Sequence, residues 1–186
     1  MSLPTITLIS FGIFDRDMLE KTAGAVVDEF HCEVILKDGH WDLSEFFDPA
    51  RHQYDGNAIL KQVQNLSFPE SDKTLALFNV DLFIPILTYI FGQAYLGGNA
   101  GIASIYRLNN ERYGMPPDQP LLLERLQKEV IHELGHNFGL IHCRDPLCVM
   151  RSSTYVEDID QKEMSFCNSC RNLLNTALSE NSTNKT

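Results

Sequence analysis

Three histidines and one glutamate at fixed spacing are the residues of this chain best suited to metal chemistry. Residues 132–142 read HELGHNFGLIH. On a helix, His132 and His136 lie one turn apart on the same face and can bind one metal ion, while Glu133 lies beside that face as a candidate general base. Gly139 can adopt the left-handed conformation that ends a helix and brings His142 back as a third ligand. Three protein ligands leave one position of a tetrahedral zinc ion open for water, as in a catalytic site.

A short match of two histidines and a glutamate also occurs by chance on charged helix surfaces, so a surface helix or a degenerate site is the alternative interpretation. The added glycine and third histidine at fixed offsets make coincidence much less frequent. This longer pattern is that of the metzincin metallopeptidases. We therefore predict a catalytic zinc site.

Four cysteines follow the third histidine in two closely spaced pairs. Cys143 and Cys148 are separated by four residues, and Cys167 and Cys170 by two. Such pairs match a closed structural zinc site with four thiolate ligands. Two disulfides are the competing explanation, although nothing in the chain indicates an oxidising compartment. The fifth cysteine, Cys32, alternates with apolar residues in a predicted strand and is expected to be a buried free thiol.

With these residues in view, the chain resembles the archaemetzincins, a family of metzincin-like zinc peptidases. The motifs that carry the resemblance lie between His132 and Cys170. The resemblance implies a catalytic zinc on the three histidines, Glu133 as the base, a second zinc on the four cysteines, and Met150 in the turn beneath the catalytic metal. It leaves an aminopeptidase preference open. The interval 151–166 is slightly shorter than the usual family spacing and falls in a predicted loop.

Some metzincins use a tyrosine just after the turn methionine to assist the metal. Tyr155 lies five residues after Met150, and we do not expect it to act in this way. Met150 by itself has a second interpretation that does not conflict with the first, because a methionine that packs beneath zinc ligands is also an ordinary core residue.

The residues predict hydrolysis of a peptide bond in a peptide or protein substrate. A catalytic zinc lowers the pKa of its bound water to about 7, and Glu133 is expected to take the water proton and pass it to the leaving amine. Two alternatives stay open: a zinc-loaded protein that binds peptides with little or no turnover, and a protein in which both zinc ions only stabilise the fold. The intact Glu133 argues against both, because a pure ligand site needs no carboxylate there.

Composition limits the other functions that the chain can have. Its 186 residues suit one domain with a single good core. A formal net charge of −10 argues against nucleic acid as a partner. The start of the chain lacks the basic residues of a signal peptide, and the most apolar stretch, 82–96, is too short and too interrupted to span a bilayer. We expect a cytoplasmic monomer without membrane contact.

The predicted elements before residue 140 alternate between strand and helix. The histidine helix begins at Asp118, a good N-cap, and its apolar residues recur on the side opposite the histidines: Leu123, Leu126, Val130 and Leu134. Residues 5–11 and 32–36 read as parallel strands that flank a helix capped by Asp15. A further helix at 58–66, a strand at 74–80 and a hairpin of 89–96 with 101–108 are also predicted, whereas 46–57 reads as a surface loop.

Together these elements predict an α/β fold with a mixed, mostly parallel sheet and one antiparallel edge strand. We expect one metallopeptidase domain over 1–186, in which 1–139 forms an upper part with the active-site helix. Residues 140–186 then form a small C-terminal part with the cysteine site, a short closing helix and a polar tail. The strand 89–96 is the candidate edge to which an extended substrate would bind by backbone hydrogen bonds.

Overall fold

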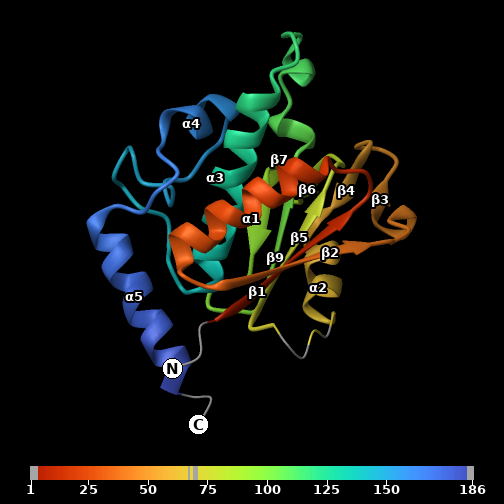
Figure 1. Ribbon diagram of the computed structural model, residues 1–186. Helices are drawn as coiled ribbons and strands as arrows, with labels where there is room; N and C mark the ends of the chain where they lie inside the picture. Colours follow the sequence, from red (N-terminus) through yellow and green to blue (C-terminus); the bar gives the residue numbers. More distant parts are fainter. Residues whose placement is uncertain (1–3, 67, 69–70, 184–186) are drawn as a thin grey trace.

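A five-stranded mixed sheet forms the centre of the molecule (Figure 1). The computed structural model describes residues 4–66, 68 and 71–183. The spatial order of the strands is β2-β1-β5-β9-β8, where their bounds are Glu33–Gly39, Thr5–Phe11, Lys73–Phe78, Ala100–Ser104 and Gly92–Ala94. Neighbouring strands are parallel except for β8, which runs antiparallel to β9 at one edge. The predicted mixed sheet with one antiparallel edge strand is confirmed.

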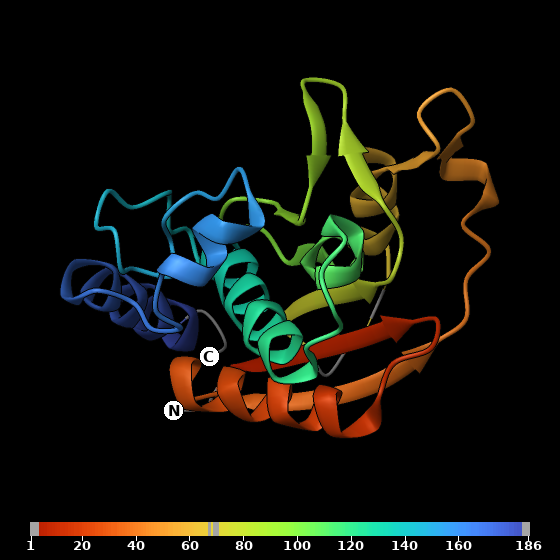
Figure 2. The same ribbon diagram turned by 90° about the horizontal axis from the view of Figure 1, so that it is seen from above.

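Helices cover both faces of this sheet because the strands are apolar on both sides. In β1, Ile6 and Leu8 pack into one apolar cluster with helices α1 (Arg16–Phe30) and α3 (Gln119–Asn137). Ile9 and Phe11 point the other way, into a second cluster with α2 (Gly56–Gln64). This alternation follows the two-residue period of a strand. Figure 2 shows α1 and α3 on one side of the sheet and α2 on the other.

A second, smaller sheet includes two strands in the segment 46–57, which the sequence predicts as loop. Its order is β3-β4-β6-β7, and the strands are Phe47–Asp48, Gln53–Asp55, Leu82–Ile84 and Leu87–Ile90. The prediction of loop over 46–57 is therefore wrong in part. Strands of two or three residues are too short to show an alternating pattern. Asp55, at the end of this predicted loop, caps α2, because its carboxylate accepts a hydrogen bond from the backbone N–H of Ala58 at 3.2 Å.

The predicted hairpin also differs from the structure in both of its strands. The segment 89–96 is divided at the buried residue Phe91 into β7, which belongs to the small sheet, and β8, which belongs to the main sheet. In the second strand, β9 ends at Ser104 and a 3-10 helix follows at Tyr106–Leu108. A continuous run of β-forming residues does not reveal that the chain passes from one sheet to another.

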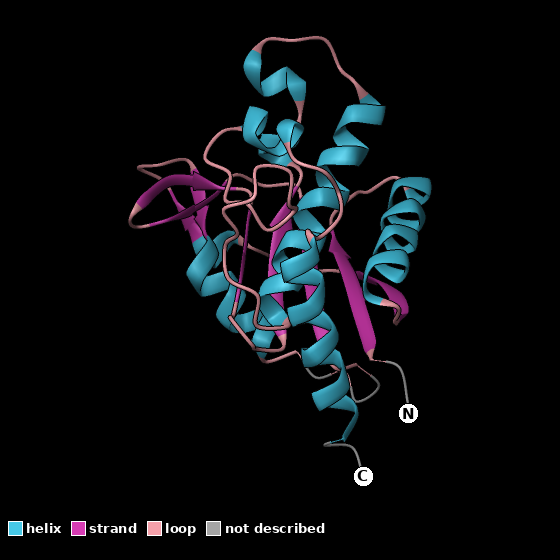
Figure 3. Ribbon diagram, turned by 90° about the vertical axis from the view of Figure 1, so that its left-hand side faces the viewer, coloured by secondary structure: helices cyan, strands magenta, loops and turns pink. Residues whose placement is uncertain are grey.

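The C-terminal part contains two helices, α4 (Val156–Gln161) and α5 (Asn168–Thr183). The closing helix is confirmed and is longer than predicted, while α4 lies in a stretch predicted as loop. Figure 3 shows the strands of the main sheet between helices, with α5 running beside them. Among the described residues, no helix is both long enough and apolar enough to cross a bilayer.

Candidate active site and metal centre

Helix α3 carries the histidine motif into the centre of the molecule. It begins after Asp118, whose carboxylate accepts a hydrogen bond from the backbone N–H of Leu121 at 3.0 Å, and Pro120 stands in its first turn. The predicted apolar face is confirmed for Leu126, Val130 and Leu134, which are fully buried. Leu123, the fourth predicted residue, is half-buried. The helix ends at Asn137, and Gly139 has a positive φ of 89°, as the return of the chain toward His142 requires.

The three histidines converge on one point. One ring nitrogen of each of His132, His136 and His142 lies within 4.8 Å of the corresponding atoms of the other two. His132 is buried, His136 is half-buried and His142 is exposed, so the group extends from the interior to the surface. This spatial arrangement agrees with the prediction that a helix and a glycine turn bring the three rings together.

Backbone carbonyls fix the orientation of two of the rings. The Nδ1–H of His132 donates to the carbonyl oxygen of Val149 at 2.8 Å, and that of His136 donates to Leu140 at 2.7 Å, because a carbonyl can only accept. The two Nε2 atoms therefore carry lone pairs, and they lie 3.2 Å apart. Burial lowers the pKa of both histidines, most strongly for His132, and so favours the neutral form that binds metal.

The spacing of these nitrogens suits zinc. A tetrahedral zinc ion with Zn–N bonds of about 2.0 to 2.1 Å places two ligand nitrogens about 3.3 Å apart. Two lone pairs that face each other at 3.2 Å repel unless a cation lies between them. The donor set and its geometry therefore fit the metal that the sequence predicts.

Glu133 lies in the same cleft with an oxygen that lacks a hydrogen-bond partner. Its side chain is buried, and Oε2 has no partner in the described part of the chain. Burial and the neighbouring carboxyl of Glu129 raise the pKa of Glu133 well above its usual value. A buried carboxyl oxygen without a partner is costly, so its presence indicates a position shaped for a ligand or water.

Met150 packs against α3 between the first two histidines. The residue is fully buried, and a Cβ added to Gly135 would overlap its sulfur atom. Glycine at this helical position therefore gives the methionine the space that it occupies. The position agrees with the expected turn beneath the metal ligands, although packing alone also accounts for a buried methionine.

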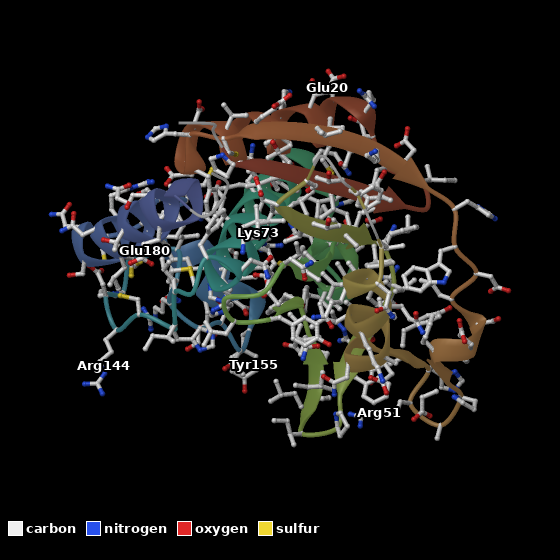
Figure 4. All side chains as sticks on the ribbon, turned by 90° about the horizontal axis from the view of Figure 1, so that it is seen from below. Glu20, Arg51, Lys73, Arg144, Tyr155 and Glu180 are labelled. Atoms are coloured by element: carbon white, nitrogen blue, oxygen red, sulfur yellow. The ribbon has the colours of Figure 1, made fainter. Side chains whose placement is uncertain are left out.

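An open cleft of about 400 Å³ connects these groups with solvent. Its walls are residues 87–94 of the strands β7 and β8, the motif residues of α3, and residues 152–155 after Met150. The hydroxyl of Tyr89 donates to the carbonyl oxygen of Thr154 at 3.0 Å and joins the two walls. Tyr155 also lines the cleft and is largely exposed, pointing away from the body of the molecule (Figure 4).

The four cysteines form a second cluster. The sulfur atoms of Cys143, Cys148, Cys167 and Cys170 lie within 4.8 Å of one another, and all five cysteine thiols of the chain are free. Cys143 and Cys167 have their sulfurs 3.8 Å apart, which is the edge of a tetrahedron with Zn–S bonds of about 2.3 Å. A disulfide would need about 2.0 Å. The cluster geometry therefore suits a metal better than the disulfide alternative.

Backbone N–H groups also point toward these sulfurs. The N–H of Asp145 donates to Cys143 and that of Cys167 donates to Cys148, both at 3.4 Å. Burial raises the pKa of the Cys148 thiol overall, and the N–H of Cys167 acts against that rise by stabilising the thiolate. Cys32 lies apart from this cluster, and burial raises the pKa of its thiol to about 12, as expected for a buried free cysteine.

Two charged residues of the cleft were not predicted from the sequence. Glu129 and Lys162 are both buried and line the same cavity as Glu133. The ammonium of Lys162 donates to the carbonyl oxygen of Arg151 at 3.0 Å. Glu129 precedes Glu133 by four residues, so helical spacing could have indicated it. Lys162 follows the short helix α4 and has no spacing signal.

Comparisons with known proteins agree with this geometry. The profile described as "Peptidase family M54" matches residues 40–176. An archaemetzincin of Pyrococcus horikoshii is 41% identical over 159 residues, which is 82% of this chain and 82% of that protein. The crystal structure of an archaemetzincin from Methanopyrus kandleri superposes with a TM-score of 0.84 at 33% identity, covering 95% of this chain and 96% of that one. A zinc-dependent peptidase from Methanocorpusculum labreanum gives a TM-score of 0.83 at 29% identity, with 91% and 99% covered.

Proposed function

This chain belongs to peptidase family M54, the archaemetzincins, and is a zinc metallopeptidase; on that premise we propose which role each of its own residues has in the reaction. His132, His136 and His142 hold the catalytic zinc, and Glu133 is the general base. When bound, the zinc ion acidifies a water molecule and polarises the substrate carbonyl. The fixed orientation of His132 and His136 supports this assignment, since each points its Nε2 toward the common centre.

Glu133 moves the proton in this mechanism. Its carboxylate takes a proton from the attacking water and passes it to the leaving amine, so that no covalent bond to the protein is needed. The single observation that carries the proposal is the buried, partnerless Oε2 in the cleft beside the converging histidines. Neither a surface helix nor a purely structural metal site would explain why a buried carboxylate oxygen lacks a hydrogen-bond partner at this position.

The substrate is a peptide or protein segment in extended form. β8 runs at the edge of the main sheet and lines the cleft, so its backbone is available for pairing. Backbone hydrogen bonds to this strand would align the scissile bond with the histidine cluster. We propose only the shorter strand β8, Gly92–Ala94, as the pairing edge, and not the whole predicted segment 89–96, because β7 belongs to the other sheet.

The cysteine cluster holds a second, structural zinc in this proposal. Four thiolates fill all positions of a tetrahedral ion and leave none for water. The sulfur spacing of 3.8 Å and the N–H donors to Cys143 and Cys148 support a closed site. On this basis the chain is one domain with the cleft between an upper part, 1–139, and a C-terminal part, 140–186.

Glu133→Gln tests the assignment of the base. The variant is expected to fold and to keep its metal, because the side chain is not a ligand, and to lose at least about 100-fold in peptide hydrolysis. Cleavage of a mixed peptide library, with and without chelator, measures the activity, and native mass spectrometry measures the metal content.

Glu20→Gln is the matched control on another helix. Glu20 of α1 is exposed and pairs with the exposed Arg16 at 2.8 Å, outside the cleft lining, so its replacement should leave cleavage unchanged. Full cleavage by purified Glu133→Gln would show that Glu133 is not the base. Metal-loaded wild-type protein that binds peptides without cleaving them would favour the peptide-binding alternative.

A further inference from the structure

Gly92 of the edge strand β8 lies in close proximity to the proposed base. A Cβ built on Gly92 would lie 2.8 Å from Cγ of Glu133 and 2.9 Å from its Oε1. It would also lie 2.7 Å from the carbonyl oxygen of Ile102 in β9. Contacts below 3.0 Å are essentially never made by a real Cβ, so no other residue fits here without movement.

Space, and not backbone conformation, is what requires glycine at this position. The glycines with positive φ in the described chain are Gly12, Gly97, Gly114 and Gly139, and Gly92 is not among them. The backbone conformation of Gly92 therefore does not by itself exclude a residue such as alanine. What glycine provides is a close approach between a strand and a side chain of the helix that crosses it.

The helix and the strand cannot separate easily to make room. The backbone N–H of Gly97 donates to the carbonyl oxygen of His136 at 2.8 Å. The side-chain amide of Asn137 donates to Tyr95 at 3.2 Å and to Ala100 at 2.8 Å. These bonds fasten the β8–β9 turn to the end of α3, so a methyl group at Gly92 would displace the side chain of Glu133 before it displaces the helix.

The side chain of Glu133 is enclosed by protein except where it faces the cleft. It is 4% exposed, and the equally buried Glu129 lies one helical turn away on the same face. The strand at Gly92 blocks the side toward the sheet, and Oε2 is left without a partner in the cleft. We propose that Gly92 is a positioning residue for the general base: the bare backbone of β8 forms the wall against which the carboxylate of Glu133 is held in its working orientation. This inference rests on the role of Glu133 proposed above.

The first test is the activity of Gly92→Ala. A displacement of a reacting group by about 1 Å can lower a rate by about 100-fold, and we expect a loss of kcat of that order. KM should change little, because the substrate pairs with the backbone of β8. Metal content should stay at the wild-type value. A loss confined to KM would overturn the inference, since it would place Gly92 in substrate binding.

Gly101→Ala is the matched control in the neighbouring strand. A Cβ there would meet Asn137 Oδ1 at 3.1 Å and Ala94 at 3.3 Å, so it crowds the same sheet without touching Glu133. It should therefore change kcat much less than Gly92→Ala. An equal loss of kcat in both variants would show that general crowding of the sheet, and not the position of Glu133, is responsible.

The second test does not depend on catalysis. The melting temperature is measured for Gly92→Ala in the wild-type background and in the Glu133→Ala background, which lacks Cγ and the carboxylate. The contact with Ile102 is the same in both, so it cancels in the double-mutant cycle. We expect Gly92→Ala to lower the melting temperature less when Glu133 is Ala, and equal decreases would overturn the proposal.

The two proposals fail in different ways. If Glu133→Gln kept full activity, Glu133 would not be the base, yet the melting cycle could still show that Gly92 and Glu133 are in steric contact. If the cycle showed no coupling, Gly92 would lose its role while Glu133 kept its own. If Gly92→Ala alone did not fold, a folded double variant would support the contact with Glu133.

Discussion

The parts of the chain before and after residue 140 share one apolar core but differ in what is added to it. The first part supplies the strands of the main sheet and the whole second cluster, while the first cluster also buries residues of the second part, among them Val149, Met150, Ile159 and Leu174. After it, α4 has only six residues, and long loops connect it to its neighbours. Burial of apolar area therefore stabilises both parts, and the second part, which contributes no described strand, depends in addition on individual polar contacts and on its cysteines.

Two buried cations of α3 fasten this second part to the first, and a third buried cation lies within the second part. Arg125 of α3 forms a bidentate pair with Asp160 at 2.7 Å and also donates to the carbonyl oxygen of Leu108 at 2.7 Å. Lys128 donates to the carbonyl oxygen of Ile159 at 3.2 Å, and Lys162 donates to a loop carbonyl after Met150. All three cations are 2–3% exposed. Each contact is directional, so the loss of one partner leaves a buried charge.

The largest expected effect comes from removing the thiolates. Cys167→Ser with Cys170→Ser should abolish the structural zinc site, whose binding free energy can reach on the order of 10 kcal/mol. The part after residue 140 should then open while the sheet stays folded. Because Cys143 directly follows His142, the catalytic site should also lose affinity for zinc.

His136→Ala is the contrasting variant. It should empty the catalytic site and leave the thiolate zinc bound, because no cysteine depends on that histidine. Metal analysis should give two zinc ions per wild-type chain, one for His136→Ala and fewer than one for the double cysteine variant. Full catalytic zinc and an unchanged melting curve in the cysteine variant would refute this coupling.

The next effect in size concerns Arg125. Arg125→Met should lower the free energy of unfolding by about 3 kcal/mol, at the low end for a broken buried pair because the side chain of Asp160 is 32% exposed and can be solvated. Urea denaturation measures the loss, and limited proteolysis should locate the new cleavage sites after residue 140. New sites within the main sheet would instead show that the two parts unfold together.

The smallest effect is expected for an exposed ion pair of the first part. Arg16 and Glu20 on α1 lie 2.8 Å apart, and their side chains are 62% and 59% exposed. Arg16→Met should leave the free energy of unfolding nearly unchanged, because solvent screens an exposed ion pair. If its effect in the same urea titration matched that of Arg125→Met, burial would not explain the difference between the two parts.

Apolar patterns that repeat over many residues predicted the long strands and helices that pack in the apolar clusters. The main strands, α1 and α3 follow from two- and four-residue spacing, and the caps Asp15 and Asp118 act as expected. The ligand clusters were also predictable, since their members lie close in sequence. The small sheet and α4 were not, because their elements are too short to carry a period.

Contacts between segments that are distant in the sequence could not be predicted either. Lys162 reaches the cleft only because α4 turns the chain back toward α3. In the sequence Gly92 cannot be distinguished from a glycine of a turn. Its proximity to Glu133 depends on the crossing of β8 and α3. Such contacts are properties of the assembled fold and not of local spacing.

The bonds that join the β8–β9 turn to α3 have a consequence for local opening. An edge strand of three residues would ordinarily fray and exchange its amide hydrogens quickly. Here the half-buried Lys73, labelled in Figure 4, donates to the carbonyl oxygens of Gly98 at 2.8 Å and Asn137 at 3.0 Å. The Gly97 N–H is bound to the helix end as well. We therefore expect the amide of Gly97, in an exposed turn, to exchange with solvent as slowly as amides of α3, so that the upper rim of the cleft opens only when the helix itself unfolds.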